Sequence, residues 1–344
     1  MKKYLLPKTG KFYKANMHSH TTCSDGKVTP EDLKAQYKAA GYSIVAFTDH
    51  EIMLPHPELS DEEFLPITGV EIAIDDGKWS PFTKTYHINI YSPELKRCAT
   101  RAYFYGEVWG NAKNYMTDEM IIPGQRSRNY SVEFAQWIID SANEEGCLVC
   151  LNHPIWSLQT KDDYSSLKGL WGVEWYNTGC VESPRGHYTD SVEPIVELLR
   201  EGERRVYPIA ADDCHSTADF FGGWLWVKAA SLDYDTVFKA LKKGNFYSSN
   251  GPTIKSLSLE GTTVSIKTSA AKTICVISNH RWARREKADG KRMLSGASFD
   301  LKSLIENSKA APEGEAVWFR LEVTDKEGNK ALTRAYFLDE LRLI

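Results

Sequence analysis

Histidines and carboxylates that could bind metal ions stand in short, closely spaced groups in the first two thirds of the sequence. His18 and His20 are two residues apart, and Asp213 and His215 repeat this spacing with a carboxylate in the first position. On an extended strand, side chains two residues apart project from the same face, roughly 7 Å apart. Both members of such a pair can therefore reach a single ion, and imidazoles with carboxylates form a ligand set typical of catalytic metal sites.

Further potential ligands follow other apolar runs. Asp25 lies beside Gly26, whose conformational freedom permits a reversal that aims the carboxylate back toward the strand ends. Glu71 has two carboxylate oxygens and is our candidate for a ligand shared by two ions. Three histidines complete the set: His50, His87 and His153. A lone histidine is more often structural, but chance does not account for nine ligand-type residues at successive strand ends.

The elements that must position these side chains alternate between short apolar runs and helical periodicity from residue 15 to about 245. This alternation predicts repeated β/α units and a largely parallel sheet, whose C-terminal strand ends face a common site. We expect strands over 15–20, 43–50, 64–72, 85–91, 147–154, 171–177 and 205–215. We expect helices over 132–145, 192–201 and 234–243, and another that Thr29 caps and Gly41 closes.

Two segments depart from this alternation. Residues 93–130 are aromatic and contain glycine without a clear period, which indicates a long insertion of the kind that often forms a lid or a binding loop. Beyond residue 250 the apolar residues alternate at period two around turn residues. We therefore expect a domain over 1–250 and a small antiparallel, immunoglobulin-like β-sandwich over 251–344.

Composition limits the classes of binding partner and the cellular compartments that we expect for the protein. A formal net charge of -4 argues against a broad grip on the phosphate backbone of duplex nucleic acid. No apolar stretch is long enough to span a membrane, and the N-terminus lacks the apolar core of an export signal. Seven scattered cysteines form no disulfide framework. We expect a cytoplasmic protein, unless a leader precedes the given sequence; the oligomeric state is left open.

The motifs resemble those of the PHP (polymerase and histidinol phosphatase) domain family. The likeness rests, in order along the chain, on HSHTTCSDG from His18 to Gly26, FTDHE from Phe47 to Glu51, Gly69-Val70-Glu71, His87, Asn152-His153-Pro154 and Asp213-Cys214-His215. It covers roughly residues 14–250. The resemblance implies a distorted seven-stranded β/α barrel with a trinuclear metal site that hydrolyses phosphate esters. Asp212 and Asn152 depart from the family pattern, which has small residues there.

The resemblance also assigns the ligands. One ion would bind His18, His20, Glu71 and Asp213. A second ion would bind Glu71, His87 and His153, and a third would bind Asp25, His50 and His215. Two or three divalent ions are expected, and zinc, manganese and iron all suit such ligands. We place Asp49 outside the ligands, where it would orient an imidazole.

The chemistry expected of such a site is attack by an activated water on phosphorus. Adjacent cations lower the pKa of a bound water and stabilise the charge that develops on phosphoryl oxygens. We expect Glu71, Asp25 and His215 to be catalytic, with Asp25 or His215 managing the proton of the leaving group. Phosphate also needs basic partners. Arg185 is the best candidate, followed by Arg126, Arg128 and Lys84.

The leading hypothesis is a phosphoesterase that acts on a small substrate, such as a nucleotide or a sugar phosphate. Two alternatives stay open. The same metals could hydrolyse a non-phosphate ester or an amide. The chain could also be a binding protein whose metals are structural and whose C-terminal domain recognises a partner.

Overall fold

The computed structural model describes residues 2–102, 105–122, 126–182, 191–290 and 292–344. Each of the seven predicted strands has a counterpart: β2 (Lys11–Asn16), β3 (Ile44–Phe47), β4 (Leu65–Asp75), β5 (Thr85–Tyr91), β6 (Leu148–Leu151), β7 (Gly172–Asn177) and β8 (Tyr207–Ala211). Two more strands follow, β9 (Trp224–Ala229) and β10 (Phe246–Ser249). β2 ends at Asn16, so His18 and His20 lie just beyond the strand and not within it.

The four predicted helices are present close to their expected bounds, together with short helices that were not predicted. These helices are α1 (Pro30–Ala39), α2 (Val132–Glu144), α3 (Lys161–Tyr164), α4 (Thr178–Glu182), α5 (Glu193–Arg200) and α6 (Tyr234–Lys242), with short 3-10 helices η1 (Pro57–Leu59), η2 (Tyr105–Glu107), η3 (Gly110–Tyr115), η4 (Asp118–Met120) and η5 (Thr217–Asp219). At the start of α1, the Thr29 hydroxyl accepts a hydrogen bond from the backbone of Asp32, as expected for an N-cap. Gly41 adopts a φ of +80° just after the helix. No helix in the described ranges is both long and apolar enough to cross a membrane.

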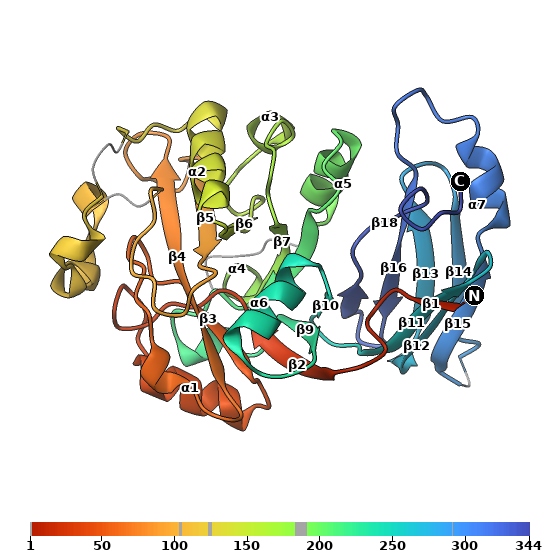
Figure 1. Ribbon diagram of the computed structural model, residues 1–344, viewed down its shortest axis with the longest axis horizontal. Coiled ribbons are helices and arrows are strands. Elements are labelled where there is room, and N and C mark those ends of the chain that lie inside the picture. Colours follow the sequence, from red (N-terminus) through yellow and green to blue (C-terminus); the bar gives the residue numbers. More distant parts are fainter. Residues whose placement is uncertain (1, 103–104, 123–125, 183–190, 291) are drawn as a thin grey trace.

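The C-terminal part consists mainly of strands. These are β11 (Ile254–Glu260), β12 (Thr263–Ala271), β13 (Thr273–Ser278), β14 (Ala283–Lys287), β15 (Leu294–Asp300), β16 (Trp318–Thr324), β17 (Lys330–Leu332) and β18 (Tyr336–Phe337), with helix α7 (Lys302–Ser308). The N-terminal strand β1 (Lys2–Tyr4) pairs with β11, so both ends of the chain lie among these strands (Figure 1).

The strands of the described residues form one large mixed sheet and one small sheet. The large sheet has the order β14-β13-β16-β17-β10-β9-β2-β3-β4-β5-β6-β7-β8, and β18 pairs with β16. The small sheet has the order β1-β11-β12-β15. Buried side chains of both sheets, such as Leu257, Phe299, Val276 and Leu321, pack in one hydrophobic cluster. Because β10 pairs with β17, backbone hydrogen bonds connect the N-terminal and C-terminal parts.

The expectation of a largely parallel sheet is wrong at one strand that matters for the site. β2, β3 and β4 are parallel, as are β6, β7 and β8, but β5 runs antiparallel to both β4 and β6. The N-terminal end of β5 therefore lies beside the C-terminal end of β4, with His87 directly opposite Ala73. Nine residues separate the end of β4 from the start of β5, which suffices for a hairpin but not for a helical crossover.

Candidate metal centre

All nine residues predicted as ligands meet at one edge of the large sheet. His18 and His20 follow β2, His50 follows β3, His153 follows β6, and Asp213 and His215 follow β8. Glu71 and His87 lie within β4 and β5, and Asp25 lies in the loop before α1. These residues form overlapping groups whose ligand atoms lie within 4.8 Å of one another. A cluster of histidine, aspartate and glutamate side chains able to hold metal is therefore present.

The most buried group joins His18, His20, Glu71 and Asp213. Nε2 of His18 and Nε2 of His20 each lie 3.1 to 3.2 Å from Oε2 of Glu71 and from Oδ1 of Asp213. Ligand atoms of a tetrahedral site with metal–nitrogen bonds of about 2.0–2.1 Å are separated by roughly 3.3 Å. Both carboxylate oxygens are buried and accept no hydrogen bond within the described residues. The group therefore fits a metal ion, which would satisfy these two oxygens.

Glu71 is the common member of the cluster. Its Oε1 lies 3.0 Å from Nδ1 of His87 and 3.6 Å from Nε2 of His153, whereas its Oε2 lies 3.4 Å from Nδ1 of His50. A second compact group consists of His50, Glu71 and His87. His153 lies equally close to Asp213, 3.5 Å from Oδ2. The two oxygens of Glu71 thus face different imidazoles, an arrangement suited to a ligand shared between ions.

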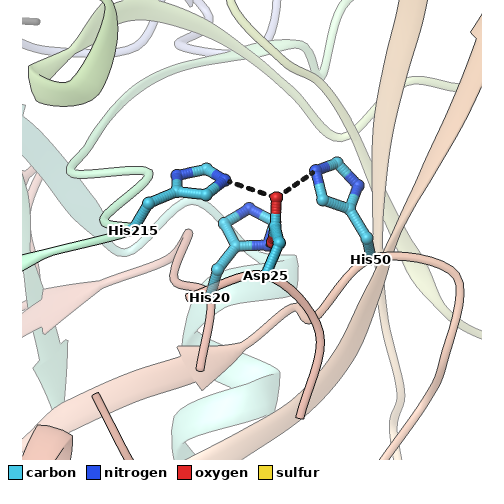
Figure 2. Close-up of side chains that lie close together, drawn as sticks. All are labelled: His20, Asp25, His50 and His215. Carbon is cyan, nitrogen blue, oxygen red and sulfur yellow. Dashed lines mark ion pairs between the residues drawn. The ribbon is translucent and has the colours of Figure 1, made fainter. Parts of the chain in front are cut away.

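The third group, shown in Figure 2, joins His20, Asp25, His50 and His215. Oδ2 of Asp25 lies 3.2 Å from Nε2 of His215 and 4.0 Å from Nε2 of His50. The side chains of Asp25 and His215 are 29% and 38% exposed, whereas those of His18 and His20 are fully buried. The cluster is therefore open to solvent on the side of Asp25 and His215.

Gly26 allows the Asp25 loop to pack tightly. A Cβ atom at this position would lie 2.4 Å from the carbonyl oxygen of His20, which the backbone could not accommodate. The chain thus reverses at Gly26 as expected. Glycine is required there because two backbone segments approach closely, and not because the residue has a positive φ. Asp49 supports the same loop by accepting hydrogen bonds from the backbone N–H of Thr21 and the hydroxyl of Ser24, both at 2.7 Å.

The pKa shifts show that the site attracts positive charge. Burial alone would raise the pKa of Glu71, yet the neighbouring imidazoles, His18 first among them, hold it well below its ordinary value. Burial alone would lower the pKa of His20, but the adjacent carboxylates of Asp213 and Glu71 raise it to about 10. Burial lowers the pKa of His50 to about 3. In the ion-free protein, a protonated His20 would neutralise part of the negative charge of Glu71 and Asp213. In the metal-loaded protein, the ion would take over this role.

Several backbone conformations at the site are strained. Asp213, His153 and Glu51 have φ values of 51°, 27° and 62°. Left-handed conformations of residues other than glycine cost of order 1–3 kcal/mol and persist where surrounding contacts enforce them. The N–H of Asp213 donates to the carbonyl of His18 at 2.9 Å, and the N–H of Glu51 donates to the carbonyl of Glu71 at 2.8 Å. Ligand-bearing segments thus hold one another in place.

Glu174 is a functional residue that the sequence analysis missed. It lies in β7, is buried, and its Oε1 contacts Nδ1 of His18 at 2.8 Å. Its Oε2 accepts from the N–H of His153 at 3.0 Å and from the Asn177 amide at 2.8 Å. The role of orienting an imidazole, expected of Asp49, therefore belongs to Glu174, because Asp49 is engaged with the Asp25 loop. The only signal in the sequence is a glutamate within the otherwise apolar strand run WGVEWYN.

The two departures from the family pattern also support the site. The side-chain amide of Asn152 donates to Oε1 of Glu71 at 2.8 Å. The carboxylate of Asp212 is fully buried and accepts five hydrogen bonds at 2.7–2.9 Å, from the hydroxyls of Tyr37 and Thr178 and from the N–H groups of residues 221–223. Burial raises its pKa, although these donors act in the opposite direction. Asp212 thereby anchors the segment that carries Asp213.

The predicted phosphate-binding residues are engaged elsewhere, as far as they are described. Nζ of Lys84 donates to Oδ2 of Asp163 at 2.7 Å, and Arg126 lies over the ring of Trp137 at 5.3 Å. The guanidinium of Arg128 pairs with Glu51 at the border of the cluster. Their partners lie 11 to 79 positions away in the sequence, so local patterns do not reveal them. Arg185 lies outside the described residues.

Parts of the 93–130 insertion lie against the metal centre. The ring of Trp109 is 5.4 Å from that of His50, and the amide of Asn111 donates to the carbonyl of Thr22 at 3.3 Å. With Arg128 bound to Glu51, the described parts of the insertion border the site. Its role as a lid stays a prediction.

Solved structures and one family model are similar to the chain. The similar solved structures include three proteins of low sequence identity. One is a two-domain protein of Bacteroides vulgatus containing a predicted PHP-like metal-dependent phosphoesterase, with 14% identity, a TM-score of 0.44, and 97% of each chain covered. The second is a proposed metal-dependent phosphoesterase of Bifidobacterium adolescentis, with 16% identity and a TM-score of 0.37, covering 62% of this chain and 90% of that chain.

The third is an amidohydrolase of Chromobacterium violaceum with bound sulfate and no metal, with 17% identity and a TM-score of 0.37, covering 59% of this chain and 88% of that chain. No curated protein matches the sequence. The family model of the PHP domain matches residues 16–134, which include six of the nine clustered ligand residues. This match confirms, over residues 16–134, the resemblance that the motifs indicated.

Proposed function

We propose that the protein is a metal-dependent hydrolase that cleaves phosphate esters of a small substrate at a site for two or three divalent ions. The observation that carries this proposal is the position of Glu71, whose two buried oxygens face five imidazoles within 3.0 to 3.6 Å. Such a carboxylate can be shared between ions, and zinc, manganese and iron all suit the mixed imidazole and carboxylate ligands.

The residues of the chain divide the work at this site. When bound, the ions would supply a water of lowered pKa and positive charge for the phosphoryl oxygens. His18, His20, Glu71 and Asp213 would hold the buried ion. With the proton on Nδ1, His18 donates a hydrogen bond to Oε1 of Glu174, which leaves Nε2 free to serve as a ligand. The hydrogen position follows from this contact.

The open side of the cluster is where the substrate would enter. Asp25 and His215 are the most exposed of the residues in the third group, and they contact each other at 3.2 Å. We propose that this pair holds the proton that the leaving alkoxide requires. Structural metal sites are usually closed, whereas catalytic sites keep a position open. The exposure of Asp25 and His215 thus favours a catalytic centre over a structural one.

Hydrolysis assays on the purified protein would test the proposal. Phosphomonoesters and phosphodiesters should be turned over, chelator should abolish the turnover, and added metal should restore it. His18→Ala should lower kcat/KM by at least about a hundredfold, since even residues behind the ligands contribute 10–100-fold. His280→Ala, a histidine after β13 in the C-terminal part, is the matched control. Turnover of carboxylic esters or amides but of no phosphate ester would contradict the proposal.

A further inference from the structure

A cavity of about 350 Å³ adjoins the candidate metal centre. Its walls come from the end of β4, from η2 and from the insertion: Glu51, Ala73, Ile74, Asp75, Gly77, Glu107, Trp109 and Arg128. Ala73 is the register partner of His87, and the ring of Trp109 is 5.4 Å from that of His50. A substrate whose phosphate reaches the ligands could therefore place its remaining part in this cavity.

The charges on the walls exclude an anion from the cavity. Asp75 and Glu107 line it, and neither forms an ion pair within the described residues. Arg128 is the basic residue of the lining, but its guanidinium pairs with Glu51 and donates to the carbonyl of Ala73 at 2.8 Å. A second phosphate or a carboxylate on the substrate would meet two carboxylates with no free cation to offset them.

The remaining chemistry of the walls suits hydroxyl groups. The two carboxylates can accept hydrogen bonds from a bound ligand, whereas the guanidinium of Arg128 is engaged with Glu51 and Ala73. Hydroxyl groups donate hydrogen bonds that these carboxylates can accept, and an ammonium group can do the same. Trp109 is 43% exposed and offers an aromatic wall. A volume of 350 Å³ lies at the small end of the range of about 300–1,000 Å³ for ligand sites.

We propose that this cavity binds a hydroxyl-bearing part of the substrate that carries no negative charge, so that the enzyme prefers monophosphates of sugars or polyols over substrates with a second anionic group. This inference rests on the proposed phosphoesterase function. Asp75 and Glu107 are the specificity-determining residues, and Trp109 is the wall against which the carbon skeleton packs.

Substrate comparison in charge-neutral variants tests the proposal. Glucose 6-phosphate and ribose 5-phosphate are compared with phenyl phosphate, which has no hydroxyls on its ring, and with fructose 1,6-bisphosphate. In Asp75→Asn combined with Glu107→Gln, kcat/KM for the sugar monophosphates should fall about tenfold or more relative to phenyl phosphate, as expected for lost hydrogen bonds to charged groups. The relative kcat/KM for the bisphosphate should rise. Asp235→Asn, an exposed carboxylate on α6, is the matched control.

Each outcome separates this inference from the proposed function. An unchanged preference in the double variant, or a wild-type preference for bisphosphates, would overturn the inference while leaving the phosphoesterase intact. Binding of glucose 6-phosphate to metal-free protein, measured by calorimetry, requires no turnover. Suppose that this binding weakens in the double variant but that the metal-loaded protein hydrolyses no phosphate ester. This result would support the proposed role of the cavity and overturn the proposed function. Absence of both binding and hydrolysis would overturn both.

Discussion

Oε1 of Glu174 lies 2.8 Å from Nδ1 of His18, in the buried interior behind the candidate metal centre. The same carboxylate holds the N–H of His153 through its other oxygen. One residue of β7 therefore orients two ligand-bearing segments that follow two other strands. Carboxylates behind histidine ligands fix the tautomer of the ring and raise its basicity.

Replacing Glu174 with glutamine keeps its shape and removes its charge. We expect Glu174→Gln to weaken metal binding by about 10–100-fold, because His18 loses its charged partner. Competition with a chelator of known affinity measures the effect. Glu203→Gln, a surface glutamate that accepts from the N–H of Gly169, is the control. Equal metal affinity in wild-type protein and Glu174→Gln would show that Glu174 does not support the ligand.

Asp212 offers a second test of how the ligands are positioned. Asp212→Asn removes the negative charge to which five donors bind. It also replaces one acceptor oxygen with an NH2 group, which would face these donors. We expect the free energy of unfolding to fall by about 3 kcal/mol, the cost of leaving buried donors unsatisfied. Metal affinity should fall as well, because Asp213 loses its anchor. Urea denaturation and metal titration measure the two effects, and an unchanged stability would contradict the anchoring role.

Metal binding should expel protons. The pKa of His20 is about 10 in the ion-free protein, so His20 is protonated at about pH 8. A histidine must be neutral to serve as a ligand, and binding should therefore release at least about one proton per chain at this pH. Calorimetric titrations in two buffers with different ionisation enthalpies count the released protons. Identical binding enthalpies in the two buffers would contradict the expected protonation.

The same shift sets how stability depends on pH. Because the folded pKa of His20 exceeds its ordinary value of 6.5, its ion pairs stabilise the ion-free protein fully below pH 6.5. This contribution is lost as the pH rises toward about 10. The metal-loaded protein carries no such proton, so the difference in Tm between loaded and ion-free protein should widen from about pH 6 to pH 10. Parallel curves would be inconsistent with this linkage.

The open group of ligands should hold the most easily lost ion. His215→Ala removes an imidazole shown in Figure 2 and leaves the buried group of His18, His20, Glu71 and Asp213 unchanged. We therefore expect this variant to bind one ion fewer per chain than the wild-type protein, with unchanged thermal stability in the ion-free state. Elemental analysis after gel filtration measures the stoichiometry. A loss of all ions would mean that the groups do not bind independently.

The sequence was sufficient to predict the strands and the side chains that cluster near their ends, because most of the motifs follow short apolar runs and strand ends converge by topology. His87 was placed correctly for an incomplete reason. It lies near the start of antiparallel β5, which reaches the site because the chain reverses after β4. Glu174 escaped prediction because a single glutamate in an apolar strand has no periodic or motif signal.

The basic residues could not be assigned from the sequence, because their partners are set by tertiary contacts. Lys84 pairs with Asp163, and Arg128 pairs with Glu51 across 77 positions of the chain. Asp212 departs from the family pattern of the motif, yet both oxygens of its carboxylate accept hydrogen bonds from the segments around it. Buried polar residues of this kind are explained only when the segments around them are seen together.

Anomalous diffraction from metal-loaded crystals tests the central claim most directly. An ion should lie within bonding distance of Nε2 of His18 and His20, Oε2 of Glu71 and Oδ1 of Asp213, with further peaks toward His87 and Asp25. Crystals soaked in metal that show no anomalous peak among these side chains would contradict the claim that they form a metal centre.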